Sequence, residues 1–229
     1  MDLDPYSHAL HDDPYPVYEE LREKYPVHYN PTHDFWHVAG YDDVLEAIHQ
    51  PQIFSSGRGI SLEIRGDGEQ SPMPMMIVMD PPSHGELRAL VNRGFTPRRI
   101  NELEARIREI ATQHIDQFIG SGQCDLWQDF AAPLPTTVIA ELLGVPVADR
   151  EWFKDRSTRI VANAGGERAA KGDNPALELG TYLAAQFEEK RKQPCDDLMT
   201  DLLEAKIDGQ SLSVPALVGF AVLLLIAGN

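Results

Sequence analysis

Two side chains four residues apart offer the clearest binding chemistry in this sequence. His84 and Arg88 lie in the stretch Asp80-Pro-Pro-Ser-His-Gly-Glu-Leu-Arg, which its prolines predict to open a helix. Residues i and i+4 of a helix share a face, so both side chains should point the same way. Arginine presents a planar fork that matches a carboxylate in two places, and histidine adds a third donor. The spacing permits a site for two acidic tails; the alternative is two ordinary surface residues, with Arg88 paired to Glu86 or another acid.

The pair lies on the first of two consecutive predicted helices. Asp80 is expected to cap a helix over residues 81–93, with proline at its first positions, where the missing N–H is harmless. Thr96-Pro97 repeats the start signal for a second helix, which Gly120 and Gly122 end. The core face of this second helix is expected at helical spacing, at Leu103, Ile107, Ile110, His114, Ile115 and Phe118.

The beginning of the chain predicts a small β-sheet. A short amphipathic helix over 16–24 precedes two strands, 27–29 and 35–39, which meet at the Asn30-Pro31 turn. Asp42 or Asp43 is expected to cap the helix that follows. Residues 55–74 are rich in Gly, Ser, Pro and charge, so a long irregular loop is expected there.

The remainder predicts a mainly α protein with a small β-sheet. Further helices are expected at 134–143, 149–163, 176–192 and 196–207. No internal repeat and no linker divides the chain, so a single domain over residues 1–229 is expected. Residues 214–229 are apolar on all sides and contain Pro215 and Gly219, which favours a buried core helix over a membrane anchor. The sequence stops within this helix, so the domain is expected to be incomplete.

Composition narrows the function classes. The net charge of -16 weighs against nucleic acid as a partner, because phosphate backbones are held by clustered Lys and Arg. Cys124 and Cys195 are too few for a disulfide framework and lack the spacing of a metal knuckle, so reduced thiols are expected. The first residues carry no basic region and no apolar run, so no secretory signal is expected and the protein is predicted to be cytoplasmic.

The stretch from Met79 to Ile100 follows a longer pattern, Asp-Pro-Pro-x-His-x-x-x-Arg-x-x-x-x-x-x-Phe-Thr-Pro, without a break through Pro97. This pattern resembles a signature of the soluble, bacterial-type cytochrome P-450 monooxygenases. In that family the two matching positions contact the propionates of the haem. The resemblance therefore implies haem b as the cofactor and assigns the propionate contacts to His84 and Arg88.

Other stretches are similar to the family's landmarks and occur in the family's order. Leu225-Ile-Ala-Gly-Asn229 resembles the opening of the long central helix, where Ala227 and Gly228 would lie over the haem. The acid and threonine that follow there in the family are absent, and so is the loop whose cysteine thiolate ligates the iron. Neither Cys124 nor Cys195 has the glycines of that loop, so no metal ligand is expected in this chain and the axial cysteine is expected beyond residue 229.

The resemblance implies a monooxygenase that inserts one oxygen atom from O2 into a small hydrophobic molecule. Electrons would come from NAD(P)H through a ferredoxin-type or flavodoxin-type partner, and the 229 residues alone are expected to be inactive. The complete protein is expected to be a monomer without a membrane span. The implied substrate pocket, for which core packing is the alternative, comprises Met76, Ile77, Val78, Phe220 and Leu224. The implied docking patch for the electron donor, for which solvated helix faces are the alternative, comprises Arg93, Arg98 and Arg99.

Two other classes of protein stay open. One is a truncated helical binding protein without catalytic activity. The other is a tail-anchored protein that uses residues 214–229 as its anchor.

Overall fold

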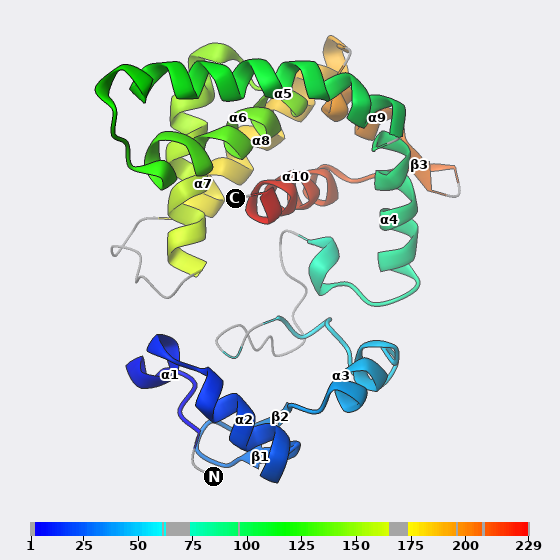
Figure 1. Cartoon of the computed structure of the whole chain (residues 1–229). Helices are drawn as coiled ribbons and strands as arrows, with labels where there is room; N and C mark the ends of the chain where they lie inside the picture. The colour runs from blue at the N-terminus through cyan, green and yellow to red at the C-terminus, as the bar shows by residue number, and fades with distance from the viewer. Residues whose placement is uncertain are drawn as a thin grey trace. The chain divides into compact units, whose positions relative to one another are not determined.

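The chain divides into two compact units, Met1–Glu69 and Gln70–Asn229 (Figure 1). The computed structural model describes residues 3–60, 62, 74–95, 97–164, 174–195, 197–207 and 209–228. Most of these residues are helical, and their strands form two separate two-stranded sheets. The fold class predicted from the sequence is confirmed. The single domain over the whole chain stays a prediction.

The amino-terminal unit is built around a β-hairpin. Strand β1 (Val27–Asn30) pairs with β2 (Phe35–Val38) in an antiparallel ladder. Asn30 is buried at the turn, and its Oδ1 accepts hydrogen bonds from the backbone N–H groups of Thr32 and His33, each at 3.0 Å. An asparagine that bonds its own backbone two and three residues on favours a turn. The hairpin predicted around Asn30 is therefore confirmed.

Helices flank this hairpin on both sides in the sequence: α1 (His8–Asp12), α2 (Tyr15–Lys24) and α3 (Tyr41–Ile48). Helix α2 confirms the helix predicted over 16–24. The cap predicted for α3 was wrong, because Gly40 occupies the N-cap position and no side chain caps the helix. Asp42 and Asp43 lie in the first turn instead, where their negative charges still favour the positive end of the helix dipole.

The carboxy-terminal unit is almost entirely helical. The helices predicted over 134–143, 149–163 and 176–192 appear as α6 (Pro133–Leu142), α7 (Arg150–Ala164) and α8 (Pro175–Lys192), with ends that differ by at most one residue. The elements of this unit are η1 (Met76–Val78), α4 (Ser83–Gly94), α5 (Pro97–Phe118), η2 (Ile119–Ser121), η3 (Trp127–Ala131), α6 (Pro133–Leu142), η4 (Val147–Asp149), α7 (Arg150–Ala164), α8 (Pro175–Lys192), α9 (Leu198–Glu204), β3 (Lys206–Ile207), β4 (Gln210–Ser211) and α10 (Val214–Gly228).

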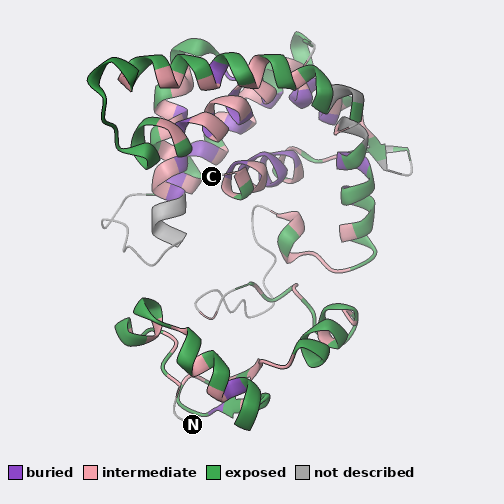
Figure 2. Ribbon diagram, viewed as in Figure 1, coloured by how far each residue is buried: buried purple, intermediate pink, exposed green. Residues whose placement is uncertain are grey.

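Helix α10 lies in the core of the carboxy-terminal unit. It contacts α6, α7, α8 and η1, and Figure 2 shows that most of its length is buried. A helix that is apolar on every side needs such surroundings, so the core helix predicted for this segment is confirmed over 214–228. Among the described residues, none of the helices combines the length and hydropathy that a membrane crossing requires. The buried residues of α10 are Leu217, Val218, Gly219, Phe220, Ala221, Val222 and Leu225.

The predicted start of α4 was wrong in its details. The helix begins at Ser83, Pro82 occupies the N-cap position, and no side chain caps it. Asp80 is therefore not the cap, although its backbone carbonyl accepts the N–H of His84 at 3.1 Å. Pro81 and Pro82 have no backbone N–H, so neither can donate to a capping carboxylate at Asp80.

The helix predicted over 196–207 was too long. Asp197 caps α9 by accepting the N–H of Thr200 at 2.9 Å, and the helix ends at Glu204 because Ala205 is extended. The chain then forms the short hairpin β3–β4, which turns at Gly209 with φ +82°. Glycine adopts this left-handed backbone without the strain of a side chain.

Candidate cofactor-binding site

Helix α4 carries the two residues that the sequence singled out. Leu87 and Leu90 of this helix are buried and fix it in the core, and the helix contacts η1, α9 and β3. His84 is half-buried and Arg88 is exposed, one helical turn further along. The i, i+4 spacing on a continuous helix confirms that both side chains belong to one face.

Neither side chain has a hydrogen-bonding partner among the described residues. Within the part of the chain that the structure describes, neither His84 nor Arg88 uses its side chain in a hydrogen bond or an ion pair. The alternative pairing of Arg88 with Glu86 is not formed, since residues i and i+2 of a helix do not face each other. A guanidinium fork and an imidazole on one helix face fit a ligand that carries carboxylates.

The end of α10 contributes the next pair of predicted residues. Ala227 is exposed and Gly228 is half-buried. A Cβ at Gly228 would collide with Cδ1 of Ile139 in α6, so the backbone of α10 approaches α6 closely at this glycine. The two residues therefore face different surroundings, and packing against α6 already accounts for the missing side chain of Gly228. Their position over a cofactor stays a prediction.

The residues predicted to contact substrate lie on two elements that touch each other, η1 and α10. Ile77 is 43% exposed, whereas Met76 and Val78 are half-buried. Phe220 is only 4% exposed and belongs to the hydrophobic core, against which Met76 and Leu224 also pack. Core packing, the alternative weighed for these residues, therefore describes Phe220 in this structure.

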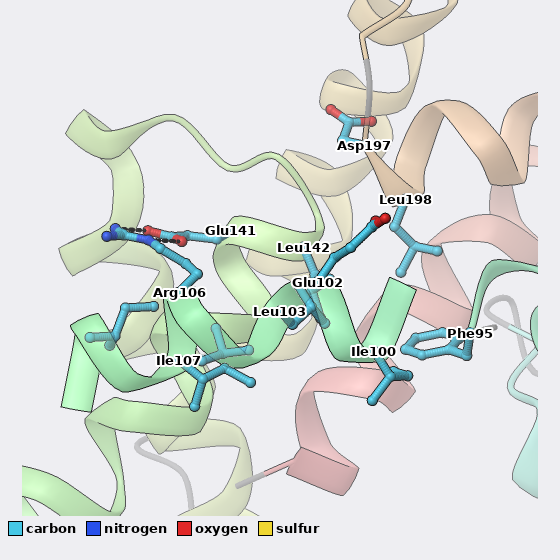
Figure 3. A pocket seen from close by; sticks show the side chains of 12 residues that line it. Phe95, Ile100, Glu102, Leu103, Arg106, Ile107, Glu141, Leu142, Asp197 and Leu198 are labelled. Atoms are coloured by element: carbon cyan, nitrogen blue, oxygen red, sulfur yellow. Dashed lines mark hydrogen bonds and ion pairs between the residues drawn. The ribbon is translucent and has the colours of Figure 1, made fainter. Parts of the chain in front are cut away.

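A pocket that the sequence did not indicate lies elsewhere in this unit, between α5, α6 and the start of α9 (Figure 3). Its volume is about 290 Å³. Leu103, Ile107 and Ile110, at i, i+4 and i+7 of α5, were predicted to face a core, but the α9 wall is distant in sequence. The pocket is lined by Phe95, Ile100, Glu102, Leu103, Arg106, Ile107, Ile110, Val138, Glu141, Leu142, Asp197 and Leu198.

An ion-pair network forms one wall of that pocket. Arg106 donates from Nε and Nη2 to the carboxylate of Glu141 at 2.8 and 2.6 Å, as Figure 3 shows. Arg150 donates to the same carboxylate at 2.6 Å. The hydrogen bond from Arg106 is the main cause that lowers the pKa of Glu141, and the bond from Arg150 acts in the same direction against the effect of burial. The network joins α5, α6 and the start of α7.

The remaining predicted residues give no further site. The side chains of Arg93, Arg98 and Arg99 lie outside the described part of the chain. Cys124 and Cys195 are exposed free thiols. Across the described ranges, no group of three or more His, Cys, Asp or Glu side chains is arranged to hold a metal ion.

Comparison with known proteins identifies the family. No family model matches the chain. It is 40% identical over 224 residues to cytochrome P450 109 of Bacillus spizizenii, a match that covers 94% of this chain and 52% of that protein. It is 40% identical over 232 residues to vitamin D(3) 25-hydroxylase of Pseudonocardia autotrophica, covering 99% and 56%.

A solved structure agrees with these relatives. Cytochrome P450 CYP109E1 of Bacillus megaterium, in complex with testosterone, superposes with a TM-score of 0.77 at 38% identity, over 95% of this chain and 55% of that one. The chain belongs to the cytochrome P450 family, as its resemblance around His84 and Arg88 implied. It spans about half the length of the curated relatives it matches. Haem is the cofactor of this family, so it is the cofactor of the full-length protein.

Proposed function

We propose that this chain is part of a haem-thiolate monooxygenase and that His84 and Arg88 bind the two propionates of its haem. One observation carries the proposal: both donors lie on one face of α4, and neither has a partner within the described residues. Haem, when bound, supplies the activation of O2 that allows one oxygen atom to enter a substrate.

The residues of this chain bind and orient in that reaction. The fork of Arg88 can take one carboxylate through two N–H groups, and the imidazole of His84 adds a donor one turn away. Leu87 and Leu90 hold α4 in the core, which fixes the position of the helix that carries both donors. Of the two small residues at the end of α10, Ala227 is the better candidate to face the haem, because Gly228 packs against Ile139.

We propose that the two substrates are O2 and a small hydrophobic molecule. The elements η1 and α10 are in contact and present Met76, Ile77, Val78 and Leu224, none of which carries a charge. Phe220 would support this wall from the core. The testosterone complex of the Bacillus megaterium relative is in keeping with an apolar ligand. Methionine side chains adapt to irregular apolar shapes, which suits a permissive pocket.

The electron donor is proposed to be a ferredoxin-type or flavodoxin-type protein that receives electrons from NAD(P)H. Arg93, Arg98 and Arg99 form a basic stretch in a chain of net charge -16, and opposite charges accelerate the encounter of two proteins. The complete enzyme is proposed to act as a cytoplasmic monomer. The 229 residues alone are proposed to be inactive, because neither Cys124 nor Cys195 lies in a glycine loop of the kind that presents the thiolate.

The full-length protein tests the proposal directly. The reduced protein under carbon monoxide should show the red-shifted absorbance band of thiolate-bound haem, and one atom of ¹⁸O2 should enter an apolar substrate. A protein that folds without haem, or a product whose oxygen comes from water, would contradict it. The 229-residue chain should lack the red-shifted band, and its presence would show that Cys124 or Cys195 ligates iron.

A further inference from the structure

The amino-terminal unit contains a pair of histidines that the proposed haem chemistry does not use. His28 of β1 and His37 of β2 stand directly opposite each other in the hairpin register. Their ring centroids lie 5.3 Å apart with an interplanar angle of 44°. Directly opposite side chains contact each other in an antiparallel pair, and like charges there are destabilising. The strength of this contact therefore depends on whether the rings are protonated.

The hydrogen bond of His37 determines which ring nitrogen carries the proton. Its Nε2 lies 3.3 Å from the backbone oxygen of Tyr25, and because a carbonyl can only accept, Nε2 must donate. Nδ1 then holds a lone pair. This atom is buried and has no hydrogen-bond partner among the described residues. A second proton would create a buried N–H without an acceptor, which is unfavourable.

The ring of Tyr25 packs against His28 with its centroid 5.4 Å away, but few described residues near the pair are buried. Within the described residues of the amino-terminal unit, Leu21 and Asn30 are the only buried ones. The burial pattern of the two strands places His28 and His37 on the same inward face as Asn30 and Phe35. A unit with so small a core has little stability to offset a buried charge.

The charges around His37 oppose its protonation. Burial is the largest cause that lowers the pKa of His37, and the charges of His28 and of the amino terminus lower it further, while the hydrogen bond to Tyr25 raises it. A group whose pKa is lowered in the folded state binds fewer protons than it does in the unfolded chain. His37 therefore has no effect on folding stability at a pH well above 6.5, the ordinary pKa of histidine. Stability decreases as the pH falls through that value.

We propose that the His28–His37 pair is an acid-sensitive latch of the amino-terminal unit. The β1–β2 hairpin is closed while both rings are neutral, and it opens when His37 is protonated. The three ingredients are the direct cross-strand pairing, the buried Nδ1 without a partner, and the small core around them. The inference concerns a different unit from α4 and does not depend on the proposed function.

Hydrogen–deuterium exchange read by mass spectrometry tests the latch on the full-length protein. Peptides that cover residues 25–40 are followed between about pH 7.5 and about pH 5.5, across the range in which histidine titrates, after correction for intrinsic exchange. The protection of this hairpin should fall roughly threefold or more in the unsubstituted protein. In His37→Gln it should stay nearly constant, because the amide can still donate to Tyr25 but takes no charge.

His49→Gln is the matched control, since His49 is exposed at the end of α3 in the same unit. This variant should keep the full acid response. Equal loss of protection in His37→Gln and in the unsubstituted protein would overturn the proposal, and so would an unsubstituted hairpin that stays protected in acid. If His37→Gln does not fold, the ring ¹⁵N shifts of the unsubstituted protein decide: a proton on Nδ1 of His37 at neutral pH contradicts the latch.

Discussion

Lys190, in the last turn of α8, forms an ion pair with Asp197, the N-cap residue of α9. The two side chains are only 14% and 9% exposed. One oxygen of Asp197 accepts from Lys190, and the other accepts the N–H of Thr200 at 2.9 Å. A single carboxylate therefore joins two helices and also caps one of them.

Replacement of Asp197 should separate these two roles. Asp197→Asn keeps an oxygen for the cap but leaves Lys190 charged and largely buried without its partner, so we expect a loss of about 2 kcal/mol in the free energy of unfolding. Asp197→Ala should lose about 1 kcal/mol more, because the cap is also removed. Urea unfolding measures both. Glu188→Gln, which breaks an exposed pair with Arg191, should change little, and an equal effect at both sites would contradict the role of burial.

Gly144 should tolerate a side chain less well than another left-handed glycine. Its φ is +64°, and an added Cβ would collide with the carboxylate of Asp197 and approach Nζ of Lys190 at 2.8 Å. Gly122 has φ +69°, but nothing lies within 4 Å of its added Cβ. Gly122→Ala should therefore lose about 1 kcal/mol for the backbone alone, and Gly144→Ala about 1 to 2 kcal/mol more. If thermal unfolding shows similar losses for the two variants, the Lys190–Asp197 ion pair moves aside without a loss of stability.

Arg88→Ala should weaken haem binding in the full-length protein. Loss of charge-assisted hydrogen bonds to a carboxylate predicts roughly a tenfold lower haem affinity. The measurement is the ratio of haem absorbance to protein absorbance after purification, followed by haem transfer to an acceptor protein. Arg108→Ala is the control, because Arg108 is exposed and pairs with Glu104 on its own helix at 2.9 Å. Equal haem retention in the two variants would exclude the role proposed for Arg88.

Glu141 should make stability depend on pH in acid. The hydrogen bond from Arg106 lowers the pKa of Glu141 below its ordinary 4.5, so the folded state binds fewer protons than the unfolded chain. Its contribution is fully present above that value and is lost as the pH falls through the lowered pKa. Glu141→Gln should therefore be less stable than the unsubstituted protein at pH 7, and the difference should shrink as the pH is lowered below about 4. A difference that stays constant with pH would show that the charge is not responsible.

Local signals predicted most of the elements and the placement of His84 and Arg88 on one helix face. The helical period predicted α5 to α8, and the asparagine turn predicted the first hairpin, because these features depend on neighbouring residues. The i, i+4 spacing of His84 and Arg88 is local in the same sense. Helix ends were less predictable: α9 stops at Glu204 because Ala205 turns extended, whereas the nearest turn signal in the sequence, Asp208-Gly209, begins four residues after Glu204.

Features that join distant residues could not be predicted from spacing. Arg106 and Glu141 are 35 residues apart and meet only because α5 packs on α6. The pocket beside them needs a third wall from α9. The exposure of Ile77 and the burial of Phe220 likewise follow from how η1 and α10 pack, although both residues are equally apolar in the sequence.

The close approach of Gly228 to Ile139 affects the rotation of α10 about its own axis. Helix α10 is apolar on every side, so contact with water does not favour one rotation of the helix about its axis over another. Side-chain packing must set this rotation. The space that Gly228 leaves for Cδ1 of Ile139 is one packing contact that does so. A side chain at position 228 would rotate α10 about its axis and change the direction in which Ala227 points. It would do so before it reduced the burial of the helix.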